Sequence, residues 1–437
     1  MHLLSVPHSL PAMRLLLPAL FLTLAAPVAA KAPPPTDYAA RVARVLKDTP
    51  LIDGHNDWAE TLAEREGDKR WTLDLTRLKS TGDDRYNTDI DRLRRGMVGG
   101  QFWSVYVPAT LPPLEQVKAT LDQIDLIRTI VARYPQAFEL ARTAADVRRI
   151  HKAGRIASIM GVEGGRQIAD DLSVLRAYHT LGAGYLTLTH SLTTDWADSA
   201  TDNPKHNGLT PYGEAVVHEL NRLGMLVDLS HVSEATMKAA LRVTKAPVIF
   251  SHSSARALDD HPRDVSDEVL GLVAANGGVV MVNFAPNYVS DKARRWAAEL
   301  AAEKARLNSP PFGGLYIGQP DKADAALKAW MAANPPPPVT LSDVADHIEH
   351  IAMVAGVDHV GLGSDFDGVG NSLPTGLENV DTYPALLAEL MRRGWSDADV
   401  AKVAGGNVLR VMEAAERVAA GMKDEPPGTA VAINAAK

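Results

Sequence analysis

One pattern recurs eight times along this 437-residue chain: a short apolar run ends in a polar or charged residue, and a stretch of helical periodicity follows. Continuous apolar runs are typical of strands buried in a parallel sheet, and the helices between them provide the crossovers. Eight such units predict an α/β protein with the (β/α)8 TIM barrel fold. The runs are 51–57, 101–106, 156–163, 185–190, 225–231, 248–252, 278–283 and 359–365.

A doubly wound open sheet is the alternative for the same alternation of strands and helices. It would place ligands at one switch point of the sheet, whereas here polar residues end nearly all the runs. The barrel is therefore the favoured prediction. The amphipathic stretches expected to surround it include 114–134, 170–181, 211–223, 233–243 and 341–355.

Two segments depart from the alternation, residues 291–338 and the tail after Met422. Residues 291–338, between the seventh and eighth strands, are rich in Ala, Lys and Pro and end in Pro335–Pro338. We expect a helical insertion there, over one rim of the barrel, as a lid or an oligomer contact. The expected organisation is a signal peptide over 1–30, the barrel over 31–422 and a flexible tail over 423–437.

The first thirty residues have the pattern of a secretory signal. Arg14 precedes the apolar stretch Leu15 to Ala26, and Val28-Ala29-Ala30 provides small residues for cleavage. The apolar stretch is shorter than the ~20 residues that span a bilayer, and Lys31 rather than Cys follows the cleavage site. We therefore expect a secreted protein without a stable membrane anchor, in a bacterial periplasm.

The amino-acid composition excludes several kinds of active site and partner. The chain has no cysteine, which excludes thiolate metal sites, iron–sulfur clusters and a cysteine nucleophile, so a metal must be bound by His, Asp or Glu. We expect a homodimer, which cannot have a disulfide between its chains. The net charge of −8, without long basic runs, argues against nucleic acid as a partner.

Acids and imidazoles stand at the ends of the predicted strands. The carboxyl ends of barrel strands converge on one face, where catalysis takes place in this fold, and such a cluster would repel itself without metal. His and carboxylate ligands suit Zn²⁺, with Mn²⁺ or Co²⁺ as substitutes, and their number fits two ions bridged by a carboxylate. The strand-end residues are His55, Asp57, Glu163, His190, His231, His252 and Asp365, with His261 beyond the sixth strand.

The same positions lie in motifs that resemble the renal (membrane) dipeptidase family, in order from about Pro50 to Met412. Further matching motifs lie around Gln101-Phe102-Trp103-Ser104 and Trp196-Ala197-Asp198-Ser199. The main motifs are Asp53-Gly54-His55-Asn56-Asp57, Gly161-Val162-Glu163-Gly164-Gly165, Leu186-Thr187-Leu188-Thr189-His190, Val227-Asp228-Leu229-Ser230-His231, Ser251-His252-Ser253-Ser254-Ala255-Arg256, His261-Pro262-Arg263 and Gly361-Leu362-Gly363-Ser364-Asp365-Phe366-Asp367-Gly368.

The resemblance implies a metal-dependent hydrolase barrel with two zinc ions that cleaves dipeptides through a metal-bridging hydroxide and tolerates a D residue at the C-terminal position. By this resemblance, His55 and Asp57 bind one zinc, His231 and His252 bind the other, and Glu163 bridges both. The resemblance also implies that His190 contacts the scissile carbonyl, Arg263 binds the substrate carboxylate and Asp365 carries the proton. Arg166-Gln167 and Trp58 depart from the family pattern and are expected near the pocket.

Each role has a physical reason. A carboxylate such as Asp365 can take a proton from water and return it to the leaving amine, and His190 can donate to a developing oxyanion. Arg263 offers a planar fork for a carboxylate. Two alternatives stay open: a related metal hydrolase acting on N-acyl amino acids or lactams, and a periplasmic binding protein without turnover. A neutral core role for His190, and an ion pair of Arg263 with Asp264 or Asp267, also stay open.

Overall fold

A computed structural model describes residues 37–82, 84–370 and 372–428. Eight parallel strands form a closed ring, because β2 pairs with β4 on one side and with β1 on the other. The (β/α)8 barrel predicted from the sequence is therefore confirmed. The strands of the ring are β1 (Leu51–Asn56), β2 (Val98–Tyr106), β4 (Ile156–Glu163), β5 (Ala183–Thr187), β6 (Leu226–Asp228), β7 (Ile249–Phe250), β8 (Val279–Val282) and β9 (Val360–Leu362).

Each of the eight strands lies within or overlaps one of the predicted apolar runs, but a ninth strand was not predicted. The strand β3 (Phe138–Leu140) pairs in parallel with Ile156–Ser158 at the start of β4, outside the ring. It has three residues, of which only Phe138 is buried. So short a segment has no periodicity that the sequence could reveal.

The helices between the strands follow the amphipathic stretches closely. The predicted helix 211–223 is observed as α7 (Pro211–Leu223), since strong signals mark both ends. The Thr210 side chain accepts a hydrogen bond from the Gly213 amide, Pro211 takes the first turn, and Gly224 follows in a left-handed conformation. The other helices with a predicted counterpart are α4 (Pro113–Arg133), α6 (Leu172–Leu181), α8 (Glu234–Val243) and α12 (Leu341–Ala355).

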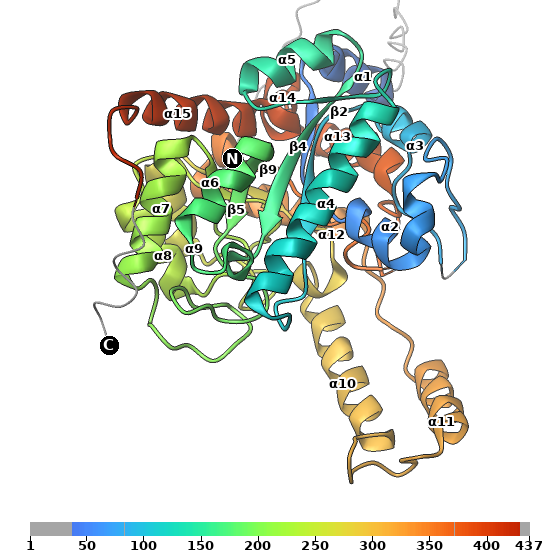
Figure 1. Cartoon of the computed structure of the whole chain (residues 1–437). Coiled ribbons are helices and arrows are strands. Elements are labelled where there is room, and N and C mark those ends of the chain that lie inside the picture. Colours follow the sequence, from blue (N-terminus) through green and yellow to red (C-terminus); the bar gives the residue numbers. More distant parts are fainter. Residues whose placement is uncertain (1–36, 83, 371, 429–437) are drawn as a thin grey trace, which may run out of the picture. The chain divides into compact units, whose positions relative to one another are not determined.

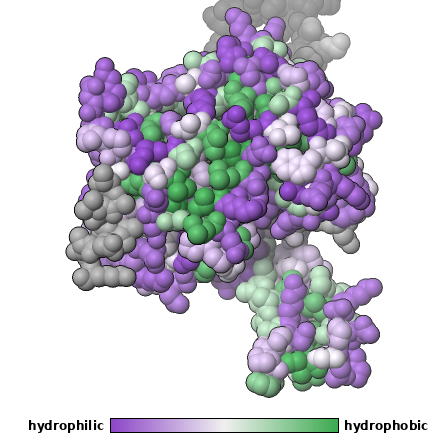
Figure 2. All heavy atoms as spheres, in the orientation of Figure 1, coloured by the Kyte–Doolittle hydropathy of each residue, from purple (hydrophilic) through white to green (hydrophobic). Residues whose placement is uncertain are grey.

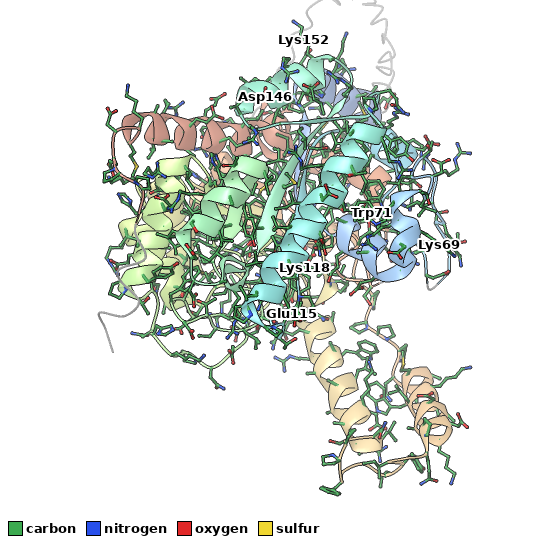
Figure 3. All side chains as sticks on the ribbon, viewed as in Figure 1. Lys69, Trp71, Glu115, Lys118, Asp146 and Lys152 are labelled. Atoms are coloured by element: carbon green, nitrogen blue, oxygen red, sulfur yellow. The ribbon has the colours of Figure 1, made fainter. Side chains whose placement is uncertain are left out.

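The outer face of α4 carries charged residues. Glu115 and Lys118 are exposed there (Figure 3), whereas Gln116 and Thr120 are buried. The inward stripe of each helix covers the barrel, as expected for amphipathic crossovers. The remaining helices are α1 (Tyr38–Asp48), α2 (Trp58–Glu66), α3 (Ile90–Arg95), α5 (Ala144–Lys152), α9 (Asp267–Asn276), α13 (Tyr383–Arg392), α14 (Asp397–Ala401) and α15 (Asn407–Gly421).

One end of the barrel is closed by helices. Strand side chains such as Ile52, Phe102 and Ile249 form a hydrophobic cluster with residues of α5 and α15. These two helices lie at the end where the strands begin (Figure 1). The opposite end, where the strands terminate, is therefore the open one.

The predicted insertion contains two helices, α10 (Asp291–Leu307) and α11 (Pro320–Ala333). They rise from the loop after β8 and extend away from the barrel as a pair, instead of lying across its rim (Figure 1). Their surface mixes hydrophilic and hydrophobic residues (Figure 2), and Phe312 and Leu315 at the turn between them are largely exposed. The role of this insertion as a lid or an oligomer contact stays a prediction.

The predicted signal peptide, residues 1–30, lies outside the described residues, as do 429–437 of the predicted tail. The tail residues that are described follow the outside of the barrel. The Gly428 amide donates to Glu219 Oε2, and Arg176 donates to the Gly428 carbonyl. Among the described residues, no helix is both long enough and apolar enough to cross a bilayer.

Candidate active site

The predicted site residues converge at the open end of the barrel. His55 is the penultimate residue of β1, and Glu163 is the last residue of β4. Asp57, His190, His231, His252 and Asp365 follow the ends of β1, β5, β6, β7 and β9, and Arg263 lies further along the segment after β7. They line or adjoin a cavity of about 470 Å³. The predicted residues on its wall are Asp57, Glu163, His190, His231, His252, Arg263 and Asp365.

Glu163 is at the centre of this cluster and is buried. Its Oε1 lies 3.0 Å from His231 Nε2 and 3.3 Å from His252 Nε2. Its other oxygen, Oε2, lies 3.4 Å from His55 Nε2 and accepts a hydrogen bond from Ser104. His55 Nε2 is also 3.3 Å from Asp57 Oδ2. One carboxylate therefore joins two groups of potential ligands.

The spacing of these atoms fits metal ions. Donor atoms bound about 2.0 Å from one tetrahedral ion lie about 3.3 Å apart, close to the separations around Glu163. The His231 and His252 Nε2 atoms are only 2.8 Å apart and both face the same Glu163 oxygen. In the part of the chain that the structure describes, three groups of side chains have their ligand atoms within 4.8 Å of one another: His55, Glu163 and His252; Glu163, His190 and His231; and His55, Asp57 and Asp365.

The electrostatics of the cluster agree with a cation. Burial lowers the pKa of His231 and of His252 well below the usual range. The charge of Arg263 adds to this effect at His231, and the charge of His55 adds to it at His252. Both imidazoles are therefore neutral, as metal ligands must be. Burial also lowers the pKa of His55, but Tyr185, Glu163 and Asp57 outweigh it and raise that pKa well above the usual value. The position between His55 and these carboxylates therefore favours positive charge.

Hydrogen bonds on the far side of the rings fix the donors. His55 Nδ1 is 2.9 Å from the Tyr185 hydroxyl, which leaves Nε2 to face the cavity. His252 Nδ1 is 2.8 Å from Ser251 Oγ, and that hydroxyl donates to Asp228 Oδ2 at 2.7 Å. Such partners set the tautomer and direction of a metal-binding histidine.

The backbone at the site is locally strained. His231, Asp365 and Asp367 have positive φ values of 68°, 65° and 66°, which non-glycine residues rarely adopt. Close by, a Cβ on Gly368 would lie 2.1 Å from Asp57 Oδ2 and 2.6 Å from Asp365 Oδ1. Only glycine allows the chain to pass so near these carboxylates.

Asp365 is placed to exchange a proton with a group in the cavity. Asn283 Nδ2 donates to its Oδ2 at 2.9 Å. One oxygen of the carboxylate also lies within 4.8 Å of a ligand atom of His55 and of one of Asp57. Burial, together with the charge of Asp57, raises the pKa of Asp365 to about 8. A fixed carboxyl with a raised pKa is the property that a general acid–base residue requires.

Arg263 is buried and lines the cavity. Its guanidinium donates to Ser253 Oγ at 3.2 Å and to the His252 carbonyl at 3.3 Å, and lies 5.3 Å from the centre of the Tyr288 ring. Among the described residues its Nε has no hydrogen-bond partner. The described ion pairs include none between Arg263 and Asp264 or Asp267, and Asp267 pairs instead with His350. The guanidinium therefore keeps donors for an anion.

His190 also faces the cavity. Its side chain is 21% exposed and its Nε2 lies 3.8 Å from Glu163 Oε1, while no described residue bonds its Nδ1. Burial lowers its pKa, which favours the neutral form. His261 is different: it does not line the cavity, and its Nδ1 accepts a hydrogen bond from the Arg263 amide.

The sequence did not identify several other residues of the cavity wall. Tyr106 at the end of β2, Tyr288 after β8, and Glu60 and Glu64 on α2 all line it. The two glutamates had the pattern of ordinary helix-surface residues. Burial, with Asp57 and Glu64 nearby, raises the pKa of Glu60 to about 9, and the opposing effect of His55 does not offset this rise.

The residues that depart from the family pattern were expected near the pocket, but their side chains do not line it. Trp58 packs in the core against Trp103 and Phe138, because the first turn of α2 directs it away from the cavity. Gln167 is buried and donates to the Glu163 and Val105 carbonyls, and Arg166 donates to the Thr193 carbonyl. Trp58, Arg166 and Gln167 therefore make structural contacts outside the cavity.

Comparisons with known proteins agree with this geometry. The family model for membrane dipeptidase, peptidase family M19, matches residues 39–426. The dipeptidase verJ of Clonostachys rogersoniana is 39% identical over 399 residues, which cover 89% of this chain and 90% of that protein.

Two solved structures are also similar. The probable dipeptidase PvdM from Pseudomonas aeruginosa is 25% identical, with a TM-score of 0.71 and coverage of 88% of this chain and 100% of that one. A metallopeptidase from Rhodobacter sphaeroides, solved with a phosphinate mimic of the dipeptide L-Ala-D-Ala, is 26% identical, with a TM-score of 0.65 and coverage of 84% and 100%.

Proposed function

Because this chain belongs to the membrane dipeptidase family, peptidase family M19, and is a dipeptidase-like enzyme, we propose that it hydrolyses the peptide bond of dipeptides at two Zn²⁺ ions. The observation that carries the proposal is the position of Glu163. Its two oxygens face different histidines, which supports a role in which one carboxylate would bind two metal ions.

We assign His55 and Asp57 to one ion, His231 and His252 to the other, and Glu163 to both. These five side chains offer only nitrogen and oxygen donors, which suit Zn²⁺ and also allow Mn²⁺ or Co²⁺. When bound, the two ions would lower the pKa of a shared water and polarise the scissile carbonyl.

The remaining groups act on the substrate. Asp365 accepts the proton of the attacking water and returns it to the leaving amine, with its second oxygen fixed by Asn283. His190 donates a hydrogen bond to the carbonyl oxygen as that oxygen gains negative charge. Arg263 binds the substrate's C-terminal carboxylate with the donors that the protein leaves free.

Binding the carboxylate close to the reacting carbonyl limits the length of the substrate, because a longer C-terminal segment would place its carboxylate away from Arg263. We further propose that a D residue is accepted at the C-terminal position. The related Rhodobacter sphaeroides structure with a mimic of L-Ala-D-Ala supports this proposal.

The test is a panel of L-L and L-D dipeptides, with N-acyl amino acids and a lactam for comparison, assayed before and after treatment with a chelator. We expect hydrolysis of both dipeptide series, loss of activity with chelator, and recovery on adding Zn²⁺. Turnover of the N-acyl compounds or the lactam without turnover of dipeptides would contradict the proposal, as would dipeptide hydrolysis by metal-free protein.

Arg263→Lys is expected to separate binding from chemistry. Lysine keeps the positive charge but cannot form two parallel hydrogen bonds to a carboxylate. Since hydrogen bonds to charged groups contribute about 1.5–3 kcal/mol, KM for a free dipeptide should rise about 10- to 100-fold. The matched control is the same dipeptide with an amidated C-terminus, whose KM should change little. Equal losses on both substrates would refute the carboxylate role.

A further inference from the structure

Two acids on the cavity wall have no role in the mechanism above. Glu60 and Glu64 are four residues apart on α2, so their side chains share one face of the helix. Both line the cavity, Glu60 half-buried and Glu64 exposed. Neither carboxylate forms an ion pair or a hydrogen bond with another described residue, so both are available to a ligand.

The nearby cation does not neutralise them. Arg65 also lines the cavity, but its guanidinium donates to the carbonyls of Asp84 and Arg85 and lies 5.0 Å from the centre of the Tyr86 ring. A third acid of this region, Asp367, accepts a hydrogen bond from the Asn87 amide. Glu60 and Glu64 are thus the acids of the wall without a partner of their own.

The position of Glu60 and Glu64 in the barrel is near the expected N-terminal end of a bound dipeptide. Arg263 follows β7 and binds His252, a ligand proposed for one metal ion. Glu60 is on the helix that follows β1, close to Asp57, a ligand proposed for the other. In the ring, β8 and β9 separate β7 from β1. A dipeptide whose carboxylate lies at Arg263 and whose carbonyl lies at the metal ions therefore extends its N-terminal residue toward α2.

From this arrangement we infer that Glu60 and Glu64 form the subsite for the side chain of the N-terminal residue and select a basic one, Lys or Arg. The inference rests on the proposed function, since it needs the peptide bond at the metal ions and the carboxylate at Arg263. Asp57, Glu163 and Asp365 lie among the proposed metal donors, and among the described residues no ion pair joins Glu60 or Glu64 to Arg65 or Arg263, the arginines that line the cavity. A cationic side chain bound beside the two glutamates would supply an opposite charge and favour the ionised form of Glu60, whose pKa is otherwise raised.

The experiment compares kcat/KM for Lys-Ala, norleucine-Ala and Glu-Ala with the metal-loaded enzyme. Norleucine has nearly the shape of lysine without its charge. We expect Lys-Ala to be preferred over norleucine-Ala about tenfold, the size of one ion pair at a partly buried site. Glu60→Gln should bring this ratio close to one, and Glu60→Lys should make Glu-Ala better than Lys-Ala.

Two further variants make the result specific. Glu64→Lys changes the more exposed acid, where a folding defect is least expected, and should lower the Lys-Ala preference in the same direction. Asp68→Asn is the control, because Asp68 follows α2, is fully exposed and does not line the cavity. It should leave the ratio unchanged.

The outcomes distinguish this inference from the proposed function. If no dipeptide is hydrolysed, the proposed function fails and the subsite fails with it. If all three dipeptides are hydrolysed at similar rates, or if the Lys-Ala preference persists in the Glu60→Gln, Glu64→Gln double variant, only the subsite is overturned.

Discussion

Glu163→Gln is expected to abolish activity and to remove metal. The two Glu163 oxygens lie between His55 on one side and His231 and His252 on the other, so a neutral amide with one acceptor cannot serve both metal positions. Loss of several kcal/mol of transition-state stabilisation corresponds to a fall in kcat/KM of at least ~10³-fold. Metal analysis of the purified variant should give at most one ion per chain, against about two in the parent protein.

The control for Glu163→Gln is Glu299→Gln, which removes a carboxylate from the exposed face of α10, outside the cavity. It should leave metal content and activity unchanged. Circular dichroism of both variants checks that the barrel is folded. A Glu163→Gln or Glu163→Ala protein that retains two ions and hydrolyses dipeptides would rule out the bridging role.

Asp365→Asn is expected to lower kcat while metal is retained. Asparagine has the size of aspartate and its carbonyl oxygen can still accept from Asn283, but it cannot take up a proton. General acid–base catalysis contributes about 10²- to 10⁴-fold, and kcat should fall within that range with KM changed little. Steady-state kinetics on one dipeptide, with metal analysis of the same sample, measures both quantities.

Asp358→Asn is the matched control for Asp365→Asn, because Asp358 lies just before β9 and Asp365 just after it. Asp358 pairs with Lys402 at the opposite end of the barrel from the cavity. Its replacement should leave kcat unchanged. If Asp365→Asn instead loses metal in proportion to its activity, Asp365 is a ligand and not the proton carrier.

The eight strands and most of their helices could be predicted because a buried parallel strand has a continuous apolar sequence. Every residue of Ile156 to Val162 in β4 and of Val279–Val282 in β8 is buried. The burial that their sequence predicts is therefore the burial that the structure shows. β3 was missed because three residues, of which one is buried, differ little from a loop. The expectation for residues 291–338 was correct in helical content but not in direction, since no local signal says where an inserted helix pair points.

The chemical residues were predictable where a polar residue ends an apolar run. His55, Glu163, His231, His252 and Asp365 each do so, and the fold brings strand ends together at one face. Tyr185 was not predictable as a partner of His55. It lies within β5, where an aromatic residue has the appearance of core, and only the register of the barrel places its hydroxyl 2.9 Å from the imidazole.

The sequence by itself predicted the barrel and the face on which the candidate site residues gather, because the continuous apolar runs and the polar residues that end them are local properties of the chain. It also excluded thiolate chemistry, since there is no cysteine. Only the tertiary structure decided which residues meet. It placed Glu163 between two sets of candidate metal ligands, left Arg263 Nε without a hydrogen-bond partner among the described residues, and turned Glu60 and Glu64 toward the cavity while Trp58 packed in the core. These are contacts between segments far apart in the chain, whose distances depend on how the barrel closes.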